Sequence, residues 1–195
     1  MSAPRRSADT TIGAGAQALA LAAIMSVAGP AAAEAPLRLS PLVAALERGL
    51  FCGVAEGNRM EAPDTEFGWI HVPETPVEMR LRGTTAPAVL GLGFGLEYTL
   101  AGSDAVLIRH VVEHPPMPPA GRSWQSWESW GLGGVPEVVF FQFDIEDELL
   151  PGRWSFTAFD GADEVFHAAF DVVAPEKAPH LAGLCAGGDL LTLSR

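Results

Sequence analysis

The most regular feature of the chain is a two-residue alternation of apolar and polar positions. Residues 77–82 and 94–100 carry apolar side chains at every second position, which is the pattern of a strand with one buried face. Residues 105–113 are rich in β-branched side chains, and residues 137–143 are apolar on both faces, as in a central strand. The pattern therefore predicts a mostly β chain.

The clearest longer signal is a hairpin towards the C-terminal end. Residues 153–159 and 164–173 carry apolar or aromatic side chains at alternate positions, and Asp160-Gly161, a favoured tight-turn pair, stands between them. Short strands separated by turns, with few helix signals, favour two packed sheets. The expected fold is an all-β, immunoglobulin-like antiparallel β-sandwich.

The segment before these strands is ambiguous. Its apolar side chains would share one face of a short N-terminal helix that starts at Ser40-Pro41, namely Leu42, Val43, Leu46 and Leu50. Leu50-Phe51-Cys52 fits a strand equally well. Both a helix and a strand are therefore compatible with this part of the sequence.

The first 33 residues have the three regions of a signal peptide. Arg5 and Arg6 precede an apolar stretch from Ile12 to Val27, and Ala31-x-Ala33 offers the small residues that signal peptidase accepts. The stretch is shorter than the ~20 residues that span a bilayer. We expect a cleaved leader over residues 1–33, no stable membrane anchor after cleavage, a single domain over residues 34–195, and a periplasmic or secreted location.

The chain is acidic, with a formal net charge of −12. Loss of Arg5, Arg6 and Asp9 with the leader would make it −13. Such a surface repels phosphate backbones and anionic headgroups, so we expect no nucleic-acid partner. Another envelope protein or a saccharide is the partner class that fits an exported acidic domain.

The two cysteines, Cys52 and Cys185, are the right number for one disulfide in an oxidising compartment. Such a bond would tie the start of the domain to its end. No C-x-x-C motif exists in the sequence, which disfavours redox chemistry at this pair. We therefore predict a structural disulfide between them.

Several short motifs carry a family resemblance: Gly49-Leu50-Phe51-Cys52, Ala62-Pro63-Asp64-Thr65, Gly93-Phe94-Gly95, His114-Pro115 and Pro151-Gly152-x-Trp154. Over most of residues 48–173 the chain resembles the bacterial family called domain of unknown function 3859. The resemblance implies an envelope β domain, and the Trp154 ring is expected to fill the core between the sheets. The family has no agreed activity, so no functional residues are implied.

The run His110-x-x-Glu113-His114 matches the inverted zinc-peptidase signature. That chemistry needs a helix, in which both imidazoles reach one metal ion. The β-type residues before the run and Pro115-Pro116 after it disfavour a helix. In a strand the two histidines would stand ~13 Å apart, and we expect them not to share a zinc ion.

Trp124, Trp127 and Trp130 are spaced by three in a segment bounded by proline and glycine. The rings could form a binding surface, or they could fold back and cap one end of the sandwich. In a strand, Trp124 and Trp130 would share a face and Trp127 would lie opposite. We expect a capping loop in which at least two of the three rings are substantially buried.

Other features offer no site. Gly91, Gly93 and Gly95 precede a strand and lack the spacing of a phosphate-binding loop, so they are expected to leave room for a large neighbour such as a tryptophan. No nucleophile elbow exists in the sequence. An acidic run, which could bind calcium but lacks the EF-hand spacing, fits a solvated connection between strands: Asp144, Glu146, Asp147 and Glu148.

These observations favour a non-catalytic binding or accessory module of the envelope, with no catalytic residue, metal or cofactor expected. The alternative is a small periplasmic hydrolase whose site is assembled from distant residues. A cavity in which His, Asp or Glu side chains converge with shifted pKa values would favour that alternative.

Overall fold

A computed structural model describes residues 35–53 and 57–186 of the chain. The predicted leader lies outside the described residues, so its cleavage and the domain boundary at residue 34 stay predictions. Within the described part of the chain, no helix is long and apolar enough to cross a membrane.

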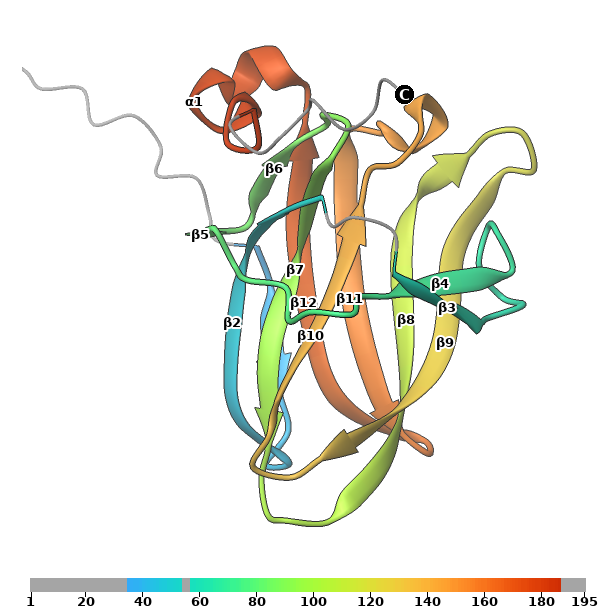
Figure 1. The fold of residues 1–195 in the computed structure, drawn as a ribbon, viewed down its shortest axis with the longest axis vertical. Helices are drawn as coiled ribbons and strands as arrows, with labels where there is room; N and C mark the ends of the chain where they lie inside the picture. The colour runs from blue at the N-terminus through green and yellow to red at the C-terminus, as the bar shows by residue number, and fades with distance from the viewer. Residues whose placement is uncertain (1–34, 54–56, 187–195) are drawn as a thin grey trace, which may run out of the picture. The chain divides into compact units, whose positions relative to one another are not determined.

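Two sheets form the body of the fold (Figure 1). One sheet has the order β1 (Leu37–Leu39), β12 (Asp163–Val173), β11 (Gly152–Asp160), β8 (Ala105–Met117) and β9 (Arg122–Leu132), with β6 (Thr85–Pro87) also along β12. The other has the order β10 (Pro136–Gln142), β7 (Leu92–Leu100), β2 (Val43–Cys52) and β5 (Leu81–Arg82). All pairs except β6–β12 are antiparallel. The predicted all-β antiparallel sandwich is confirmed.

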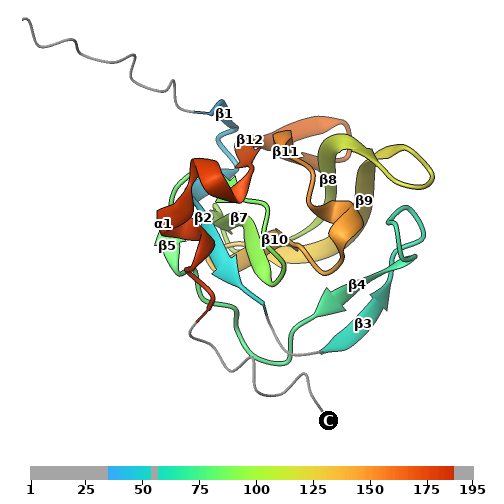
Figure 2. The ribbon, with the colours of Figure 1, turned by 90° about the horizontal axis from the view of Figure 1, so that it is seen from above.

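Two smaller parts are added to the sandwich. Strands β3 (Asn58–Glu61) and β4 (Trp69–Val72) form a separate two-stranded hairpin, and we call residues 57–72 the arm. Figure 2 shows the arm standing outside the two sheets. Short 3₁₀ turns at Glu146–Glu148 and Pro175–Lys177 and one helical turn, α1 (Pro179–Ala182), complete the described elements.

The core between the sheets is aromatic. Trp154 is fully buried, as expected, and its ring meets Phe94 edge to face with centroids 5.4 Å apart. The indole N–H of Trp154 donates to the Leu150 carbonyl oxygen at 3.0 Å, which satisfies its buried polar atom. Phe156 and Phe170 pack against the same Phe94 ring. The alternating aromatic positions of the predicted hairpin therefore supply the inner face of one sheet.

The strands predicted at residues 94–100, 105–113, 153–159 and 164–173 are confirmed as β7, β8, β11 and β12. The helix that was one alternative around residue 42 is wrong, because Val43–Cys52 forms β2. A register irregularity between Val43 and Ala45 inserts one extra residue against β7. Such a bulge reverses which face the following side chains occupy, so Val43 and Leu46 both reach the core. The bulge therefore reproduces the three-residue spacing of a helix.

Two other strand predictions need correction. Of residues 77–82, only Leu81–Arg82 pairs as a strand. The preceding residues 73–80, which we call the covering segment, cross the outer face of the β2 sheet (Figure 1), where the Met79 side chain packs over Gly49 of β2. The Arg80 N–H donates to the Leu50 carbonyl oxygen at 2.8 Å, next to the pairing of β5 with β2. Residues 137–143 were expected to be central, but β10 is an edge strand. Its second apolar face is covered by the covering segment and not by further strands.

The glycines of β7 leave room for a phenylalanine and not for the tryptophan that was expected. A Cβ on Gly95 would collide with Phe140, its partner on β10, and a Cβ on Gly93 would lie 3.0 Å from the Phe140 ring. Phe140 in turn packs against Phe51 of β2, with centroids 5.3 Å apart. The outer face of this sheet is therefore a second, smaller apolar layer.

Candidate functional site

A cavity of about 540 Å³ lies where the two sheets part. Strands β9 and β10 are the edge strands on this side and do not pair with each other. The arm and the covering segment close over the opening, and β7 and β8 supply the floor. The volume falls within the ~300–1,000 Å³ of ordinary small-molecule sites.

Strand alternation turns an aromatic wall towards the cavity. In the β8–β9 register His110 faces Trp127, and the His110 ring lies between the rings of Trp127 and Tyr98, at centroid distances of 5.4 and 6.1 Å. Six aromatic side chains line the cavity: Phe67, Trp69, Tyr98, Trp127, Phe140 and Phe141. These rings make the lining largely apolar.

The polar lining combines a histidine–serine pair with carboxylic acids. A hydrogen bond of 3.1 Å joins His110 Nε2 to Ser129 Oγ of β9. Among the described residues that line the cavity, the acids are Glu74, Glu137, Asp144 and Glu148, and no lysine or arginine takes part.

Burial makes the floor of the cavity electrically neutral at physiological pH. His110 is almost fully buried, which lowers its pKa to about 4, so the imidazole is uncharged at pH 7. The Tyr98 phenol has a raised pKa, first because it is buried and second because the Glu137 carboxylate is near. Both rings therefore act as neutral hydrogen-bonding groups.

Glu148 is the most perturbed acid in the lining. It is only 3% exposed, and burial raises its pKa to about 7. The backbone N–H groups of Asp144 and Ile145 donate to its Oε2 at 2.6 and 3.2 Å and oppose that rise. Burial also raises the pKa of Glu137. Near neutral pH, a ligand that enters the cavity can therefore change the ionisation of Glu148.

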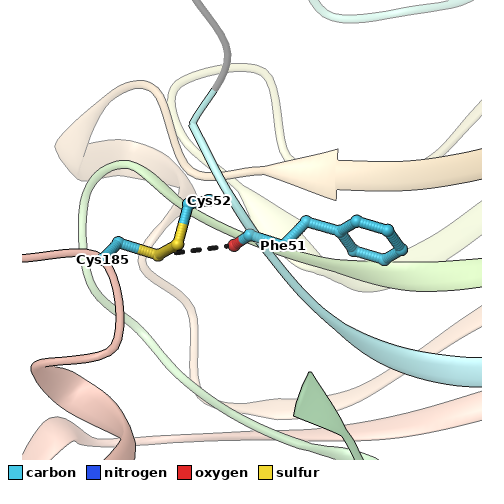
Figure 3. Close-up of a disulfide and its surroundings, with 3 residues drawn as sticks. All are labelled: Phe51, Cys52 and Cys185. Carbon is cyan, nitrogen blue, oxygen red and sulfur yellow. Dashed lines mark hydrogen bonds between the residues drawn. A yellow bond between two sulfur atoms is a disulfide. The ribbon is translucent and has the colours of Figure 1, made fainter. Parts of the chain in front are cut away.

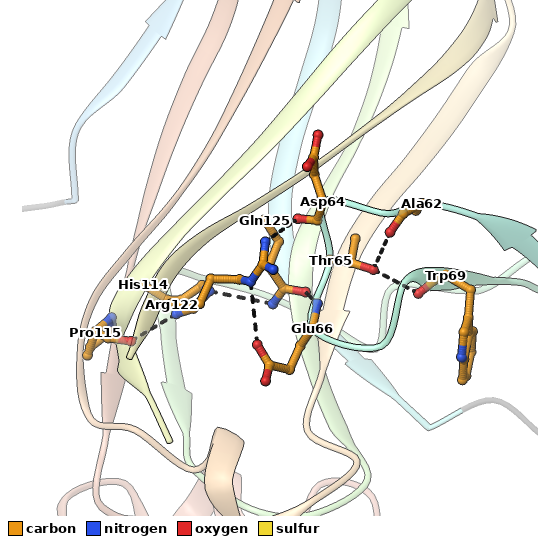
Figure 4. A network of polar contacts seen from close by, with 9 residues as sticks. All are labelled: Ala62, Asp64, Thr65, Glu66, Trp69, His114, Pro115, Arg122 and Gln125. Carbon is orange, nitrogen blue, oxygen red and sulfur yellow. Dashed lines mark hydrogen bonds and ion pairs between the residues drawn. The ribbon is translucent and has the colours of Figure 1, made fainter. Parts of the chain in front are cut away.

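A polar network fastens the arm over the cavity (Figure 4). The Glu66 N–H donates to Gln125 Oε1 at 3.0 Å, and the Arg122 guanidinium donates to the Asp64 carbonyl oxygen at 3.2 Å. The Ser126 N–H also donates to that carbonyl oxygen, at 3.2 Å. The arm is therefore held to β9 mainly through its own backbone, and Trp69 and Phe67 are carried to the mouth of the cavity.

Comparison with known proteins places the fold in a family. Residues 39–172 match the family described as Domain of unknown function (DUF3859). The chain belongs to this family. Among solved structures it is similar to an immunoglobulin-like protein from Pseudomonas aeruginosa, with 21% identity, a TM-score of 0.45 and coverage of 72% of this chain and 99% of that chain. No protein with a curated description matches.

The three tryptophans of the DUF3859 domain do not form one surface. They lie on strand β9 and not in a capping loop, and the expectation that at least two are buried is wrong: Trp124 is 45% and Trp130 67% exposed. Trp127, on the opposite face, lines the cavity. The alternative of one binding surface made by all three rings does not hold, because Trp127 lies on the other face of β9 from Trp124 and Trp130. That the protein binds another envelope protein or a saccharide stays a prediction.

The two histidines of the His110-x-x-Glu113-His114 run lie on one strand. His110 and His114 both lie on β8, as predicted, and they have different partners. His114 Nδ1 is 2.8 Å from the Pro115 carbonyl oxygen, and its Nε2 is 3.5 Å from Gln125 Nε2. No group of three or more metal-ligating side chains occurs among the described residues. His110 instead belongs to the cavity.

The predicted disulfide is confirmed. Cys52, at the end of β2, is bonded to Cys185, with Cα atoms 5.4 Å apart and a separation of 133 positions in sequence (Figure 3). The Cys185 sulfur also lies 3.5 Å from the Phe51 carbonyl oxygen. The bond fastens the segment after α1 to the sheet that holds β10.

Sequence reasoning missed most of the lining of this DUF3859 domain. Glu148 was assigned to a solvated acidic run, whereas its side chain turns inwards and that of its neighbour Glu146 stays exposed. Leu149 and Leu150, directly after it, were the available signal of burial. Ser129 could be found only from the pairing of β9 with β8, and Tyr98 only from the packing of β7 against β8 across the two sheets.

Proposed function

We propose that this DUF3859 protein is an exported binding module that holds a small ligand in the cavity under the arm. The observation that carries the proposal is the cavity itself, which combines an aromatic wall with a few convergent polar groups. Concave, mostly apolar sites with a small polar set are typical of small-molecule binding. The arm would contribute Trp69 and Phe67 as a cover over the bound ligand.

Export is supported by two separate features of the chain. The N-terminal 33 residues have the composition of a cleavable leader, and Cys52 and Cys185 form a disulfide. Structural disulfides persist in oxidising compartments and are rare in the cytosol of ordinary bacteria. A periplasmic or secreted location is part of the proposal.

The alternative function is hydrolysis, and the cavity has the feature expected of it, because His110, Glu137 and Glu148 converge there with shifted pKa values. The His110–Ser129 hydrogen bond also favours it. A serine nucleophile needs a base whose pKa lies near the working pH. The pKa of His110 is lowered to about 4 by burial alone, so it is a weak base. The pair is better suited to donating and accepting hydrogen bonds to a ligand.

Binding of a neutral fluorescent probe tests the proposal. N-phenyl-1-naphthylamine brightens in an apolar site, and the parent protein should bind it. Trp127→Ala removes one wall of the cavity and should raise the Kd about tenfold, a loss of ~1.4 kcal/mol. Trp130→Ala is the matched control, because it removes the same side chain from the opposite face of β9.

Trp127→Phe keeps an aromatic wall and should restore most of the affinity, which separates a lost contact from a damaged fold. Equal affinities of Trp127→Ala and Trp130→Ala, or no binding by the folded parent, would overturn the proposal.

A further inference from the structure

The charge of the cavity lining is one-sided. Its four acids are not balanced by any lysine or arginine among the described lining residues. Two arginines beside the cavity are engaged with the arm: Arg122 pairs with Glu66 at 3.6 Å, and Arg59 lies over the Trp69 ring. His71, also in the lining, has its Nε2 4.0 Å from an oxygen of Asp144.

We infer that the ligand is an organic cation, an amine or quaternary ammonium group attached to an apolar body. The inference rests on the proposed function and specifies the class of ligand that the cavity takes. The acids would face the cationic group and the aromatic side chains would hold the apolar body. An anionic ligand would meet only carboxyl groups and uncharged rings.

The aromatic wall favours a cation for a reason separate from the acids. The face of an aromatic ring carries partial negative charge and attracts ammonium and guanidinium groups, most strongly at tryptophan. One such contact lies beside the cavity. The Arg59 guanidinium carbon is 3.9 Å from the centroid of the Trp69 ring. Trp127 and Tyr98 offer further rings in the lining itself.

Glu148 is the residue that an incoming cation would compensate. It is buried, and the charged side chains that act on it, Asp144 and Glu66, are both acidic. A buried carboxylate without a basic partner is costly. A bound ammonium group would supply the missing positive charge and stabilise the ionised form.

The chain has a formal net charge of −12, which also favours a cationic ligand. A cleft lined by one sign of charge concentrates ligands of the opposite sign.

A charge series of similar aromatic ligands tests the inference. The probes are 2-phenylethylammonium, 2-phenylethanol and 3-phenylpropanoate, which share a phenyl group on a short chain and differ in charge. Calorimetric titration of the full mature chain at pH 8 should give the cation at least about tenfold higher affinity than the alcohol. The anion should bind most weakly of the three.

Substitution of Glu148 tests whether this acid causes the preference for the cation. Glu148→Gln should remove most of the preference for the cation and leave binding of 2-phenylethanol unchanged. Glu146→Gln is the control, because it removes an exposed acid from the same turn and should leave the preference intact.

Equal affinities across the charge series, or a preference that survives Glu148→Gln, would overturn the inference. In either case, binding of N-phenyl-1-naphthylamine that depends on Trp127 would leave the proposed function standing. If that neutral probe also fails to bind the cavity, the proposed function fails as well.

Discussion

Two buried titratable side chains determine the chemistry of the cavity, and they differ in kind. His110 is held uncharged by burial alone, with its Nε2 hydrogen-bonded to Ser129. Glu148 is also buried, but two backbone N–H groups donate to its carboxylate. Burial raises the pKa of Glu148, these donors oppose the rise, and the resulting pKa of about 7 lies where a ligand can change the ionisation of the side chain.

The raised pKa of Glu148 makes stability depend on pH. The folded protein binds this proton more tightly than the unfolded chain, since the pKa rises from 4.5 to about 7. The contribution to folding is therefore complete below pH 4.5 and is lost as pH rises through about 7. Relative to Glu148→Gln, the parent should lose roughly 3 kcal/mol of unfolding free energy over this window.

Urea unfolding of both proteins at pH 5 and pH 8 measures this difference. Glu146→Gln, whose side chain is exposed, should follow the parent at both values. Parallel stability profiles of the parent and Glu148→Gln would show that Glu148 titrates in the ordinary range.

At the scale of elements, alternation located the strands but not their neighbours. β7, β11 and β12 were predictable because alternate side chains of each are apolar and face the core, and β8 because it is rich in β-branched residues. The alternation of residues 77–82 was real as well, but only its last two residues join the sheet, as β5. The bulge in β2 and the edge position of β10 arise from pairing with β7, which the local sequence does not encode.

The glycine positions of β7 give a test at this scale. Gly95→Ala would place a Cβ against the backbone and side chain of Phe140. Since the backbone of β10 cannot move aside without breaking the pairing, we expect a loss of about 1–3 kcal/mol of stability. Urea unfolding midpoints measure the loss.

Gly183→Ala is the matched control, because its Cβ would meet nothing within 4 Å. Its stability should stay within about 0.5 kcal/mol of the parent. A Gly95→Ala protein as stable as this control would contradict the close packing of Phe140 on β7.

At the scale of the whole molecule, sequence predicted the sandwich and the disulfide, and the family resemblance was confirmed. The cavity was not predictable, because its lining comes from the arm, the covering segment and strands β7 to β10, which belong to two different sheets and meet only in the fold. Trp124, Trp127 and Trp130 show the difficulty most clearly. Their common spacing suggested one role, whereas strand geometry divides them between the cavity and the outer surface.

The tryptophans also provide the most direct test of the central claim. The chain has five: Trp69 and Trp127 line the cavity, Trp124 and Trp130 lie outside the lining and are exposed, and Trp154 is buried in the core. Each indole N–H gives its own signal in a ¹⁵N-correlated NMR spectrum. Titration with 2-phenylethylammonium should shift the signals of Trp69 and Trp127 and leave those of Trp124 and Trp130 in place. Shifts confined to Trp124 and Trp130, or no shift at all, would contradict a ligand site under the arm.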